Sequence, residues 1–192
     1  MDKQPQDSFI KKRHQSILSR TAQESPKSPL DGQKPTTEIE REIAHVQLNF
    51  GEDIDSYLRQ VEQRNLTTNA LEKHKITPVL RSRMVDWMIE VMTNFRCDDQ
   101  TFFVAICLMD RYFQAKQTCL EVNELHVTGV AAMFIASKYE DIYPLKMKDV
   151  YEKIAHKRLS HDRIKQIELE ILIVTNYNIQ APTVLEFLKV YL

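Results

Sequence analysis

The sequence predicts an all-α protein with one helix buried at its centre. Apolar residues recur every three or four positions through most of the chain after Thr37, which is the spacing of one face of an α-helix. Only three glycines occur among 192 residues, which disfavours the tight turns of multi-stranded sheets. The run VTGVAAMFIA at residues 127–136 is apolar on nearly every side and is therefore typical of a buried helix.

Composition narrows the class of protein. With 43% hydrophobic and 28% charged residues, the chain resembles a globular domain large enough to bury a core. No apolar run reaches the ~20 residues that span a bilayer, and no signal peptide opens the chain, so we expect an intracellular protein without a membrane partner. Residues 38–192 hold 19 Lys and Arg against 23 Asp and Glu. This acidic balance argues against a nucleic-acid partner.

Enzyme signatures are missing from the sequence. The three cysteines, Cys97, Cys107 and Cys119, form no CxxC pair, so we expect reduced thiols and no structural zinc. There is no Gly-rich phosphate loop, HExxH motif or nucleophile elbow. The adjacent Glu140 and Asp141 would diverge by ~100° on a helix, so they cannot converge as an acid/base pair. We therefore expect no catalytic residue, no cofactor and no metal.

The first 37 residues predict a disordered leader. They are rich in Gln, Ser, Lys and Pro and lack helical periodicity. The basic patch Lys11-Lys12-Arg13 is either a weak nuclear-targeting signal or a solvated charge run. Ser25-Pro26 and Ser28-Pro29 are candidate sites of proline-directed phosphorylation.

Residues 38–76 predict an N-terminal helical extension. Ile54, Tyr57, Leu58 and Val61 fall at i, i+3, i+4 and i+7, so they share one face of a helix near residues 52–62. Acidic residues lie in its first turn, where the helix dipole favours them. An isolated helix of this length is marginal in water, so we expect it to pack on the main domain.

Two helices open the main domain. Thr77-Pro78 combines an N-cap with a proline at the first helical position, which predicts a helix over about 78–95. Asp98 or Asp99 then caps a second helix over about 99–116. Both segments carry an apolar stripe with a period of three or four residues, so each is expected to bury one face.

Three more helices complete the domain. The buried run belongs to a third helix over about 121–139, whose small residues would let neighbouring backbones approach closely. A fourth helix is expected over about 146–155, and a fifth begins at a Ser160 cap. Pro144 and Pro182 mark the ends of helical segments. The pattern predicts five helices with the third at the centre.

Three charged residues stand inside these apolar helical runs. They are Arg81, Asp110 and Lys138, two cations and one anion from three different segments. An unpaired charge in a core is costly, so such residues are tolerated when they meet partners of opposite charge.

The strings that carry these charges are distinctive. They read LRSRMVDWMIEV at residues 80–91, MDRYF at 109–113 and ASKYEDIYP at 136–144. In this order and spacing they resemble the cyclin box of the mitotic A/B-type cyclins. The resemblance covers about residues 50–192.

This resemblance implies a domain organisation. Residues 77–180 would form a first cyclin box of five helices around a central third helix. Residues 181–192 are similar to a linker or the start of a second box, which is absent here. The chain is therefore expected to be either a fragment or a single-box cyclin.

The same resemblance implies a function. The chain is expected to be a non-catalytic regulatory subunit that binds and activates a cyclin-dependent protein kinase, helps dock its substrates and controls the G2/M transition. We expect it in the nucleus and cytoplasm. The alternatives are a truncated cyclin that binds kinase without activating it, and a cyclin-box transcription factor.

One surface is expected to contact the kinase catalytic subunit. In the family it centres on positions that match Lys138 and Glu140, at the end of the third helix, although a solvated helix end is the alternative. Arg81 and Asp110 match a structural ion pair inside the box. The residues that the resemblance assigns to kinase binding are Tyr57, Lys138, Tyr139, Glu140, Asp141, Ile142, Glu168 and Leu172.

A second surface is expected to dock peptides. Four residues of the first box helix recur at i, i+4, i+7 and i+10 and so share one face, and in cyclins this face binds substrates and inhibitors with Arg-x-Leu motifs. Arg83 stands where the family has an aliphatic residue and His126 where glutamine is usual. A cation there would repel an incoming arginine, and plain core packing is the alternative role. The residues assigned to the docking patch are Leu80, Met84, Trp87, Glu90, Leu125 and His126.

Overall fold

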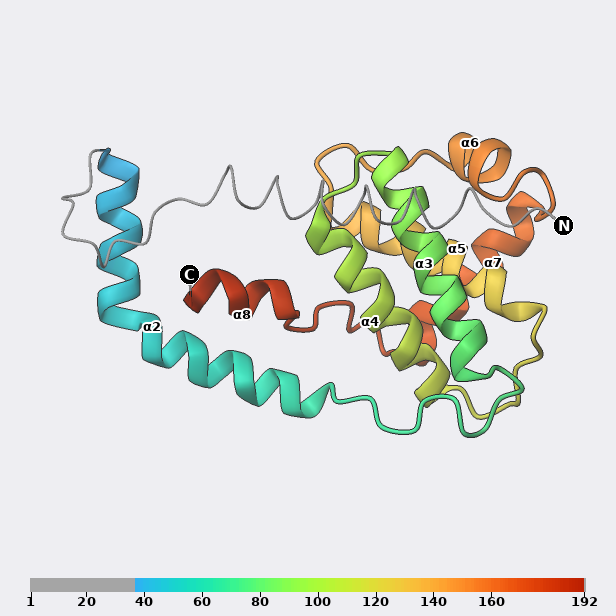
Figure 1. Ribbon diagram of the computed structural model, residues 1–192, viewed down its shortest axis with the longest axis horizontal. Coiled ribbons are helices and arrows are strands. Elements are labelled where there is room, and N and C mark those ends of the chain that lie inside the picture. The colour runs from blue at the N-terminus through green and yellow to red at the C-terminus, as the bar shows by residue number, and fades with distance from the viewer. Residues whose placement is uncertain (1–36, 192) are drawn as a thin grey trace, which may run out of the picture. The chain divides into compact units, whose positions relative to one another are not determined.

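The computed structural model describes residues 37–191, apart from some side chains within 40–48 and those of 189–191. Every element in this part of the chain is a helix, as Figure 1 shows, so the prediction of an all-α protein is confirmed. The predicted leader, with its basic patch and Ser-Pro sites, lies outside the described residues. The elements are α2 (Glu38–Arg64), α3 (Pro78–Asn94), α4 (Asp99–Ala115), α5 (Glu124–Glu140), α6 (Met147–Asp149), the π-helix η1 (Val150–Ile154), α7 (His161–Val174) and α8 (Val184–Tyr191).

The chain divides into two compact units, residues 1–51 with Leu192, and residues 52–191. The described part of the first unit is the N-terminal half of α2, where Ile39 and Phe50 keep 69% and 52% of their surface exposed. The second unit contains the rest of α2 and every later element. The core, the ion pairs and the candidate sites described below all belong to this second unit.

Helix α2 begins at the first residue of the expected extension, residues 38–76, but ends well before its last. The periodic stretch at residues 52–62 is part of a 27-residue helix, but the helix stops at Arg64 and residues 65–77 form turns. Thr67, Thr68 and Asn69 are weak helix formers. Asn69 adopts a φ of 57°, a left-handed conformation that asparagine tolerates better than most residues.

The predicted N-caps are confirmed by hydrogen bonds. The Thr77 hydroxyl accepts from the Leu80 N–H (3.3 Å), the Asp98 carboxylate accepts from the Gln100 N–H (2.8 Å), and the Ser160 hydroxyl accepts from the Arg163 N–H (3.1 Å). Each bond satisfies a donor that the first turn of a helix leaves without an intrahelical partner. The first, second and fifth box helices therefore begin where the sequence predicts.

The fourth box helix differs in type from the prediction. Only α6 is α-helical, and the chain continues as the π-helix η1, in which the Ala155 N–H donates to the Val150 carbonyl at 2.8 Å. Val150 and Ile154 both lie in the core, at 0% and 2% exposure. His156 and Lys157 then adopt left-handed φ angles of 48° and 59°, which redirect the chain toward α3.

Helix α5 is the centre of the box, as predicted. It packs against α3, α4, α7 and η1, and residues 127–137 are buried without interruption. Gly129 leaves room for the end of the Met84 side chain of α3, because a β-carbon at this position would overlap the Cε atom of Met84. The run that is apolar on all sides is therefore surrounded by other helices.

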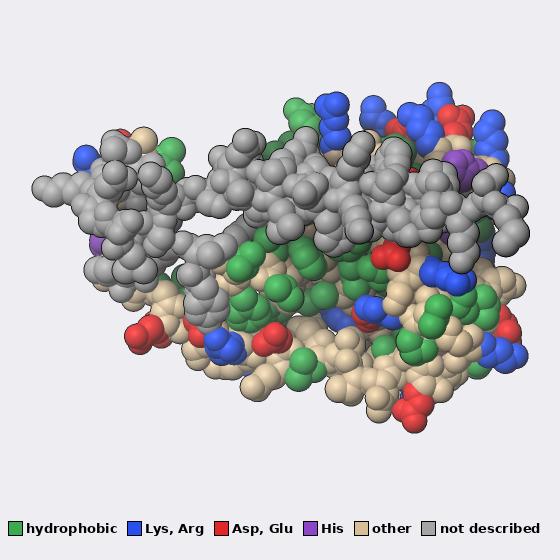
Figure 2. Space-filling view, viewed as in Figure 1, with side chains coloured by type: hydrophobic (Ala, Val, Ile, Leu, Met, Phe, Trp, Pro, Cys, Tyr) green, Lys and Arg blue, Asp and Glu red, His purple; other side chains and the backbone are tan. Residues whose placement is uncertain are grey.

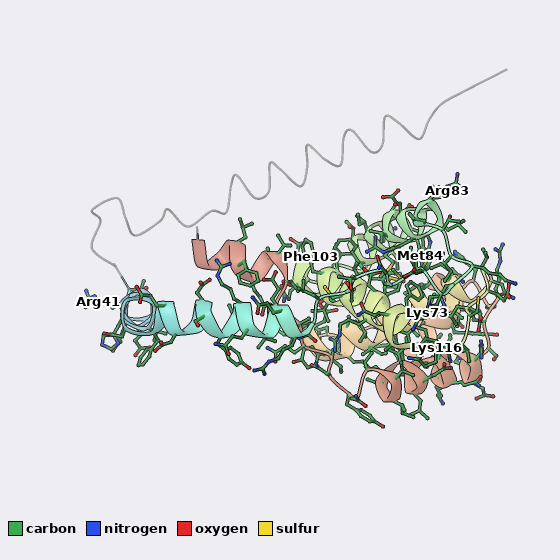
Figure 3. All side chains as sticks on the ribbon, turned by 90° about the horizontal axis from the view of Figure 1, so that it is seen from below. Arg41, Lys73, Arg83, Met84, Phe103 and Lys116 are labelled. Carbon is green, nitrogen blue, oxygen red and sulfur yellow. The ribbon has the colours of Figure 1, made fainter. Side chains whose placement is uncertain are left out.

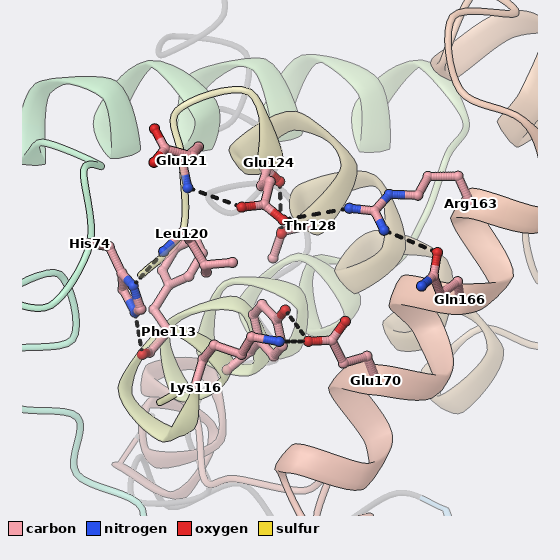
Figure 4. Close-up of polar contacts among 11 residues, drawn as sticks. His74, Phe113, Lys116, Leu120, Glu121, Glu124, Thr128, Arg163, Gln166 and Glu170 are labelled. Atoms are coloured by element: carbon pink, nitrogen blue, oxygen red, sulfur yellow. Dashed lines mark hydrogen bonds and ion pairs between the residues drawn. The ribbon is translucent and has the colours of Figure 1, made fainter. Parts of the chain in front are cut away.

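Polar contacts tie the ends of these helices together (Figure 4). His74 joins the turn before α3 to the α4–α5 connection, since its Nδ1 accepts from the Leu120 N–H (3.1 Å) and its Nε2 bonds the Phe113 carbonyl (2.6 Å). Lys116 at the end of α4 forms an ion pair with Glu170 of α7. The contacts fix the register between the layers around α5.

Helix α8 starts with a capping box. The Glu186 N–H donates to the Thr183 hydroxyl (3.4 Å), and the Thr183 N–H donates to the Glu186 carboxylate (2.8 Å). The guanidinium of Arg59 lies 5.8 Å from the centre of the Phe187 ring. Helix α8 thus contacts α2 within the second unit. Its Val184 and Leu188 side chains nevertheless remain 72% and 43% exposed.

We expect this exposed apolar side of α8 to promote association. Burying one aliphatic side chain is worth about 1.5–3 kcal/mol, so two exposed on one short helix favour self-contact at high concentration. Light scattering should show concentration-dependent association of the 192-residue chain and less of it in a chain ending at Gln180. Equal monomeric mass for both chains at every concentration would contradict the prediction.

Candidate functional site

The first charged pair links α3 to α4. Arg81 Nε donates to Asp110 Oδ1 at 2.7 Å, and its second nitrogen contacts Asp110 Oδ2, so the pair is bidentate. The Asp110 side chain is 13% exposed and the Arg81 side chain 31%. The hydrogen bond to Asp110 raises the pKa of Arg81, against the lowering effect of burial. This cation and anion therefore satisfy each other at the edge of the core.

The second charged pair links α5 to α7. The Lys138 ammonium contacts the Glu168 carboxylate and lies 4.0 Å from the centre of the Phe134 ring, a cation–π contact. The Lys138 side chain is 39% exposed and that of Glu168 17%. The pair lies at the boundary between core and solvent, where a third group is able to reach it. Two residues assigned to kinase binding are thus brought together from distant parts of the sequence.

Apolar side chains near this pair in the sequence of α5 and α7 are exposed or half-buried. Tyr139 is 47% exposed and Ile142 89%, while Leu172, one turn after Glu168 on α7, is half-buried. The sequence analysis missed Tyr143, which is 92% exposed directly after Ile142. We call the set the α5–α7 face. Its members are Lys138, Tyr139, Ile142, Tyr143, Glu168 and Leu172.

Two other residues assigned to kinase binding lie apart from the α5–α7 face or only partly on it. Tyr57 is on α2 and is 61% exposed. Glu140 is half-buried in the last turn of α5. Leu169 and Ile173, which the sequence analysis did not single out, are exposed on α7 at 54% and 53%. The end of α5 and the length of α7 therefore expose more apolar surface than a solvated helix end needs.

Asp141 points toward the inside of the box. Its Oδ1 atom accepts from the Asp98 N–H (3.0 Å) and from the Thr101 hydroxyl (2.7 Å), so it connects the end of α5 to the beginning of α4. Its Oδ2 atom is buried without a hydrogen-bond partner among the described residues. Burial, followed by the charge of Asp141, raises the pKa of the Cys97 thiol to about 12. The structure thus gives this carboxylate internal partners.

We expect Asp141→Ala to destabilise the fold. It removes two hydrogen bonds at the start of α4, a loss of about 1–2 kcal/mol for a capping carboxylate, or about 2–8 °C in melting temperature. Calorimetry should show this shift. The control is Asp86→Ala on the exposed side of α3, which should leave the melting temperature nearly unchanged. Equal melting of the two variants would remove Asp141 from the structural framework.

A groove opens beside α3, α5 and the segment after η1. Its volume is about 370 Å³. The rings of Trp87 and His126 are both part of its wall, and their centroids lie 5.0 Å apart. Five of the six residues assigned to the docking patch contribute to its walls, but Glu90 does not. We call it the α3 groove. Its lining residues are Leu80, Arg83, Met84, Trp87, Val122, Leu125, His126, Ile154, His156 and Arg158.

The α3 groove has an apolar floor and a cationic rim. In Figure 3, Arg83 projects outward from α3, whereas Met84 lies against the interior, and Met84 is 7% exposed. The rim holds Arg83, Arg158, His126 and His156, and none of the lining residues is an aspartate or glutamate. Burial lowers the pKa of His126, and the nearby Arg158 and His156 lower it further. The groove is therefore a region of positive potential.

Residues 37–191 contain no group of three His, Cys, Asp or Glu side chains placed to hold a metal ion. No described helix has the length and apolar character to cross a membrane. Cys97, Cys107 and Cys119 are free thiols.

Comparisons with known proteins match the part of the chain that contains α3 to α7. The family described as "Cyclin, N-terminal domain" matches residues 53–180. The chain is 32% identical to the G2/mitotic-specific cyclin-B1 of Oryzias luzonensis over 141 residues, which are 73% of this chain and 34% of the relative. It is also 32% identical to the G2/mitotic-specific cyclin-B1 of Xenopus laevis, over 73% of this chain and 35% of the relative. The G2/mitotic-specific cyclin-A of Patella vulgata is 30% identical over 177 residues, 91% of this chain and 39% of the relative. The chain thus spans about a third of the length of the curated relatives it matches.

Proposed function

The chain belongs to the cyclin family, and on that premise we propose that it binds the catalytic subunit of a cyclin-dependent protein kinase as its regulatory subunit. Cyclins themselves are non-catalytic, so the chain is not an enzyme. We further propose that the complex acts at the G2/M transition, because the matched relatives are named as G2/mitotic-specific cyclins. Binding, activation and timing are properties proposed for this chain.

The observation that carries the proposal is the paired charge on the α5–α7 face. Lys138 and Glu168 meet at the surface between two helices, beside the exposed side chains of Ile142 and Tyr143. A charged pair within an apolar patch suits a protein interface, since a partner covers the apolar area and adds hydrogen bonds to the charges.

The proposed mechanism is positional. The α5–α7 face packs on the regulatory helix and the activation segment of the kinase. This contact stabilises the arrangement in which a glutamate of that helix pairs with the lysine that positions ATP. The cyclin supplies no reacting group, so its contribution is the free energy of the interface.

A binding titration tests this proposal. The 192-residue chain, immobilised by one end, should bind at least one of a set of purified cyclin-dependent kinase catalytic subunits with saturation. The Ile142 side chain is 89% exposed on the α5–α7 face. Ile142→Arg places a charge where the kinase is proposed to pack, so it should weaken binding. The matched control is Val79→Arg, which is 61% exposed on α3 and should bind like the parent.

Two outcomes would count against the proposal. If the parent chain binds none of the catalytic subunits, the regulatory role is wrong. If Ile142→Arg and Val79→Arg bind equally well, a kinase is bound through another surface. Circular dichroism of both variants checks that the helices are retained.

We also propose that the protein occupies the nucleus and the cytoplasm, where a regulator of mitotic kinases would meet its partner. Fluorescence microscopy of a tagged chain in dividing cells tests this. Exclusion from both compartments, for example by retention in a secretory organelle, would contradict it.

A further inference from the structure

We propose that the α3 groove binds partner proteins through a phosphorylated serine or threonine that stands next to an apolar residue. The proposal goes beyond the proposed function, since it assigns to the groove a ligand that kinase binding does not involve. It is argued from the groove alone and is tested without a kinase.

The floor of the α3 groove suits an apolar side chain. Leu80, Trp87 and Leu125 line it, and Ile154 of η1 closes one end. A volume of about 370 Å³ accommodates one or two aliphatic side chains together with some backbone. Desolvation of such side chains against an indole ring gives a docking segment an anchor.

The rim of the α3 groove suits an anion. Arg83 and Arg158 are exposed, and among residues 37–191 no carboxylate lies within ion-pair distance of either. The other cations around the box are mostly paired, as Arg81, Lys116 and Lys138 show. The two rim arginines therefore have guanidinium groups available to a ligand.

The surroundings extend the positive potential. Residues 146–158 contain five Lys and Arg against two Asp and Glu. Figure 2 shows Lys and Arg side chains gathered over the α6 region of the surface. A ligand that approaches the groove from this side meets a field that attracts anions and repels cations.

These charges exclude the ligand that the family resemblance suggests. An Arg-x-Leu peptide needs a carboxylate for its arginine, and Glu90 is not part of the groove. Arg83 stands on the rim instead. The incoming arginine would face two cations without a counter-charge, whereas its leucine would still fit the floor.

The number of cationic groups favours phosphate over carboxylate. The guanidinium groups of Arg83 and Arg158 are the cations of this small groove, and burial keeps the pKa of His126 low. A phosphate carries about −1.5 to −2 charges and three acceptor oxygens, so its charge and its hydrogen-bonding capacity match two arginine cations. A single carboxylate has one charge and two oxygens and would leave part of the rim without a partner.

Fluorescence polarisation with short labelled peptides tests the proposal on the 192-residue chain. One peptide sequence carries two adjacent leucines and, two positions before them, serine, phosphoserine, aspartate or arginine. We expect the phosphoserine peptide to bind about tenfold or more tightly than the serine peptide, as one or two charge-assisted hydrogen bonds allow. The aspartate peptide should fall between them and the arginine peptide should bind most weakly.

Variants locate the effect. Arg83→Glu combined with Arg158→Glu should abolish the preference for phosphoserine, and both positions are exposed, so the fold should be retained. The matched control is Lys73→Glu with Lys165→Glu, which makes the same change of charge at exposed positions outside the groove. It should keep most of the preference.

Three results would overturn the proposal. They are tightest binding of the arginine peptide, equal binding of the aspartate and phosphoserine peptides, and a phosphoserine preference that survives in the groove variant. Each of them is obtained without kinase. A failure of the groove proposal is therefore distinct from a failure of kinase binding at the α5–α7 face.

Discussion

Replacing Lys138 with alanine is expected to weaken binding of the kinase catalytic subunit at least tenfold. The substitution removes one charge from the α5–α7 face and leaves the Glu168 carboxylate, only 17% exposed, without its cation. When a partner protein then covers the face, this carboxylate is buried unpaired. Truncating one member of a hydrogen-bonded charge pair in an interface costs ~2–5 kcal/mol, and ~1.4 kcal/mol already corresponds to tenfold in affinity.

Isothermal titration calorimetry measures this loss, and two variants define its cause. Lys148→Ala removes an exposed lysine from α6, outside the α5–α7 face, and should bind like the parent. Lys138→Ala combined with Glu168→Gln should recover part of the affinity, because the unpaired carboxylate is gone. If Lys138→Ala binds the kinase as tightly as the parent chain does, Lys138 is not part of the interface.

Replacing Arg81 with alanine is expected to cause the largest loss of stability. It leaves the Asp110 carboxylate, 13% exposed, without either bond of its bidentate partner. Breaking a buried pair costs ~3–5 kcal/mol, and the partial exposure of Arg81 lowers our expectation to ~2–3 kcal/mol. For a protein of this size that corresponds to a fall of ~4–12 °C in melting temperature.

Thermal unfolding followed by circular dichroism measures the effect of Arg81→Ala. The control is Lys153→Ala, which breaks an exposed pair with Asp149 one turn away and should leave the melting temperature close to that of the parent. Arg81→Ala with Asp110→Ala should be more stable than Arg81→Ala alone, because no charge is left unpaired. If all three variants have the melting temperature of the parent chain, the Arg81–Asp110 pair contributes nothing to the stability of the fold.

Much of the fold could be predicted because local rules and burial agree. Thr77, Asp98 and Ser160 are good N-caps ahead of amphipathic segments, and each is confirmed as a cap. The run around Gly129 has no polar side to expose, so its central position follows from composition alone. These features depend only on residues that are close together in the sequence, so the sequence alone predicts them.

The deviations arise where tertiary contacts decide. The π turn at 150–154 is one example, because side chains four residues apart share one face in an α-helical turn as well, so periodicity cannot distinguish the two. The left-handed residues His156 and Lys157 then determine where Arg158 lies. Arg83 and His126 were singled out from the sequence, but the contribution of His156 and Arg158 to the rim of the α3 groove had no signal in its spacing.

The charged residues illustrate the same limit. The cost of an isolated charge predicts that Arg81, Asp110 and Lys138 have partners, and only the family resemblance named Arg81 and Asp110 as a pair. The structure pairs Arg81 with Asp110 and Lys138 with Glu168. Asp141 was expected to face a partner protein with its neighbours, yet its hydrogen bonds are to the start of α4. Helical spacing alone does not say which side of a helix end turns inward.

The most direct test of the central claim is the rate at which a bound kinase phosphorylates histone as the 192-residue chain is titrated in. If the chain is an activating regulatory subunit, the rate should rise from the low level of the free catalytic subunit and saturate at one chain per kinase. Lys138→Ala should shift the midpoint to higher concentration and leave the plateau in place. Saturable binding without any rise in the phosphorylation rate would contradict activation, and it would identify the chain as a cyclin that occupies the kinase without switching it on.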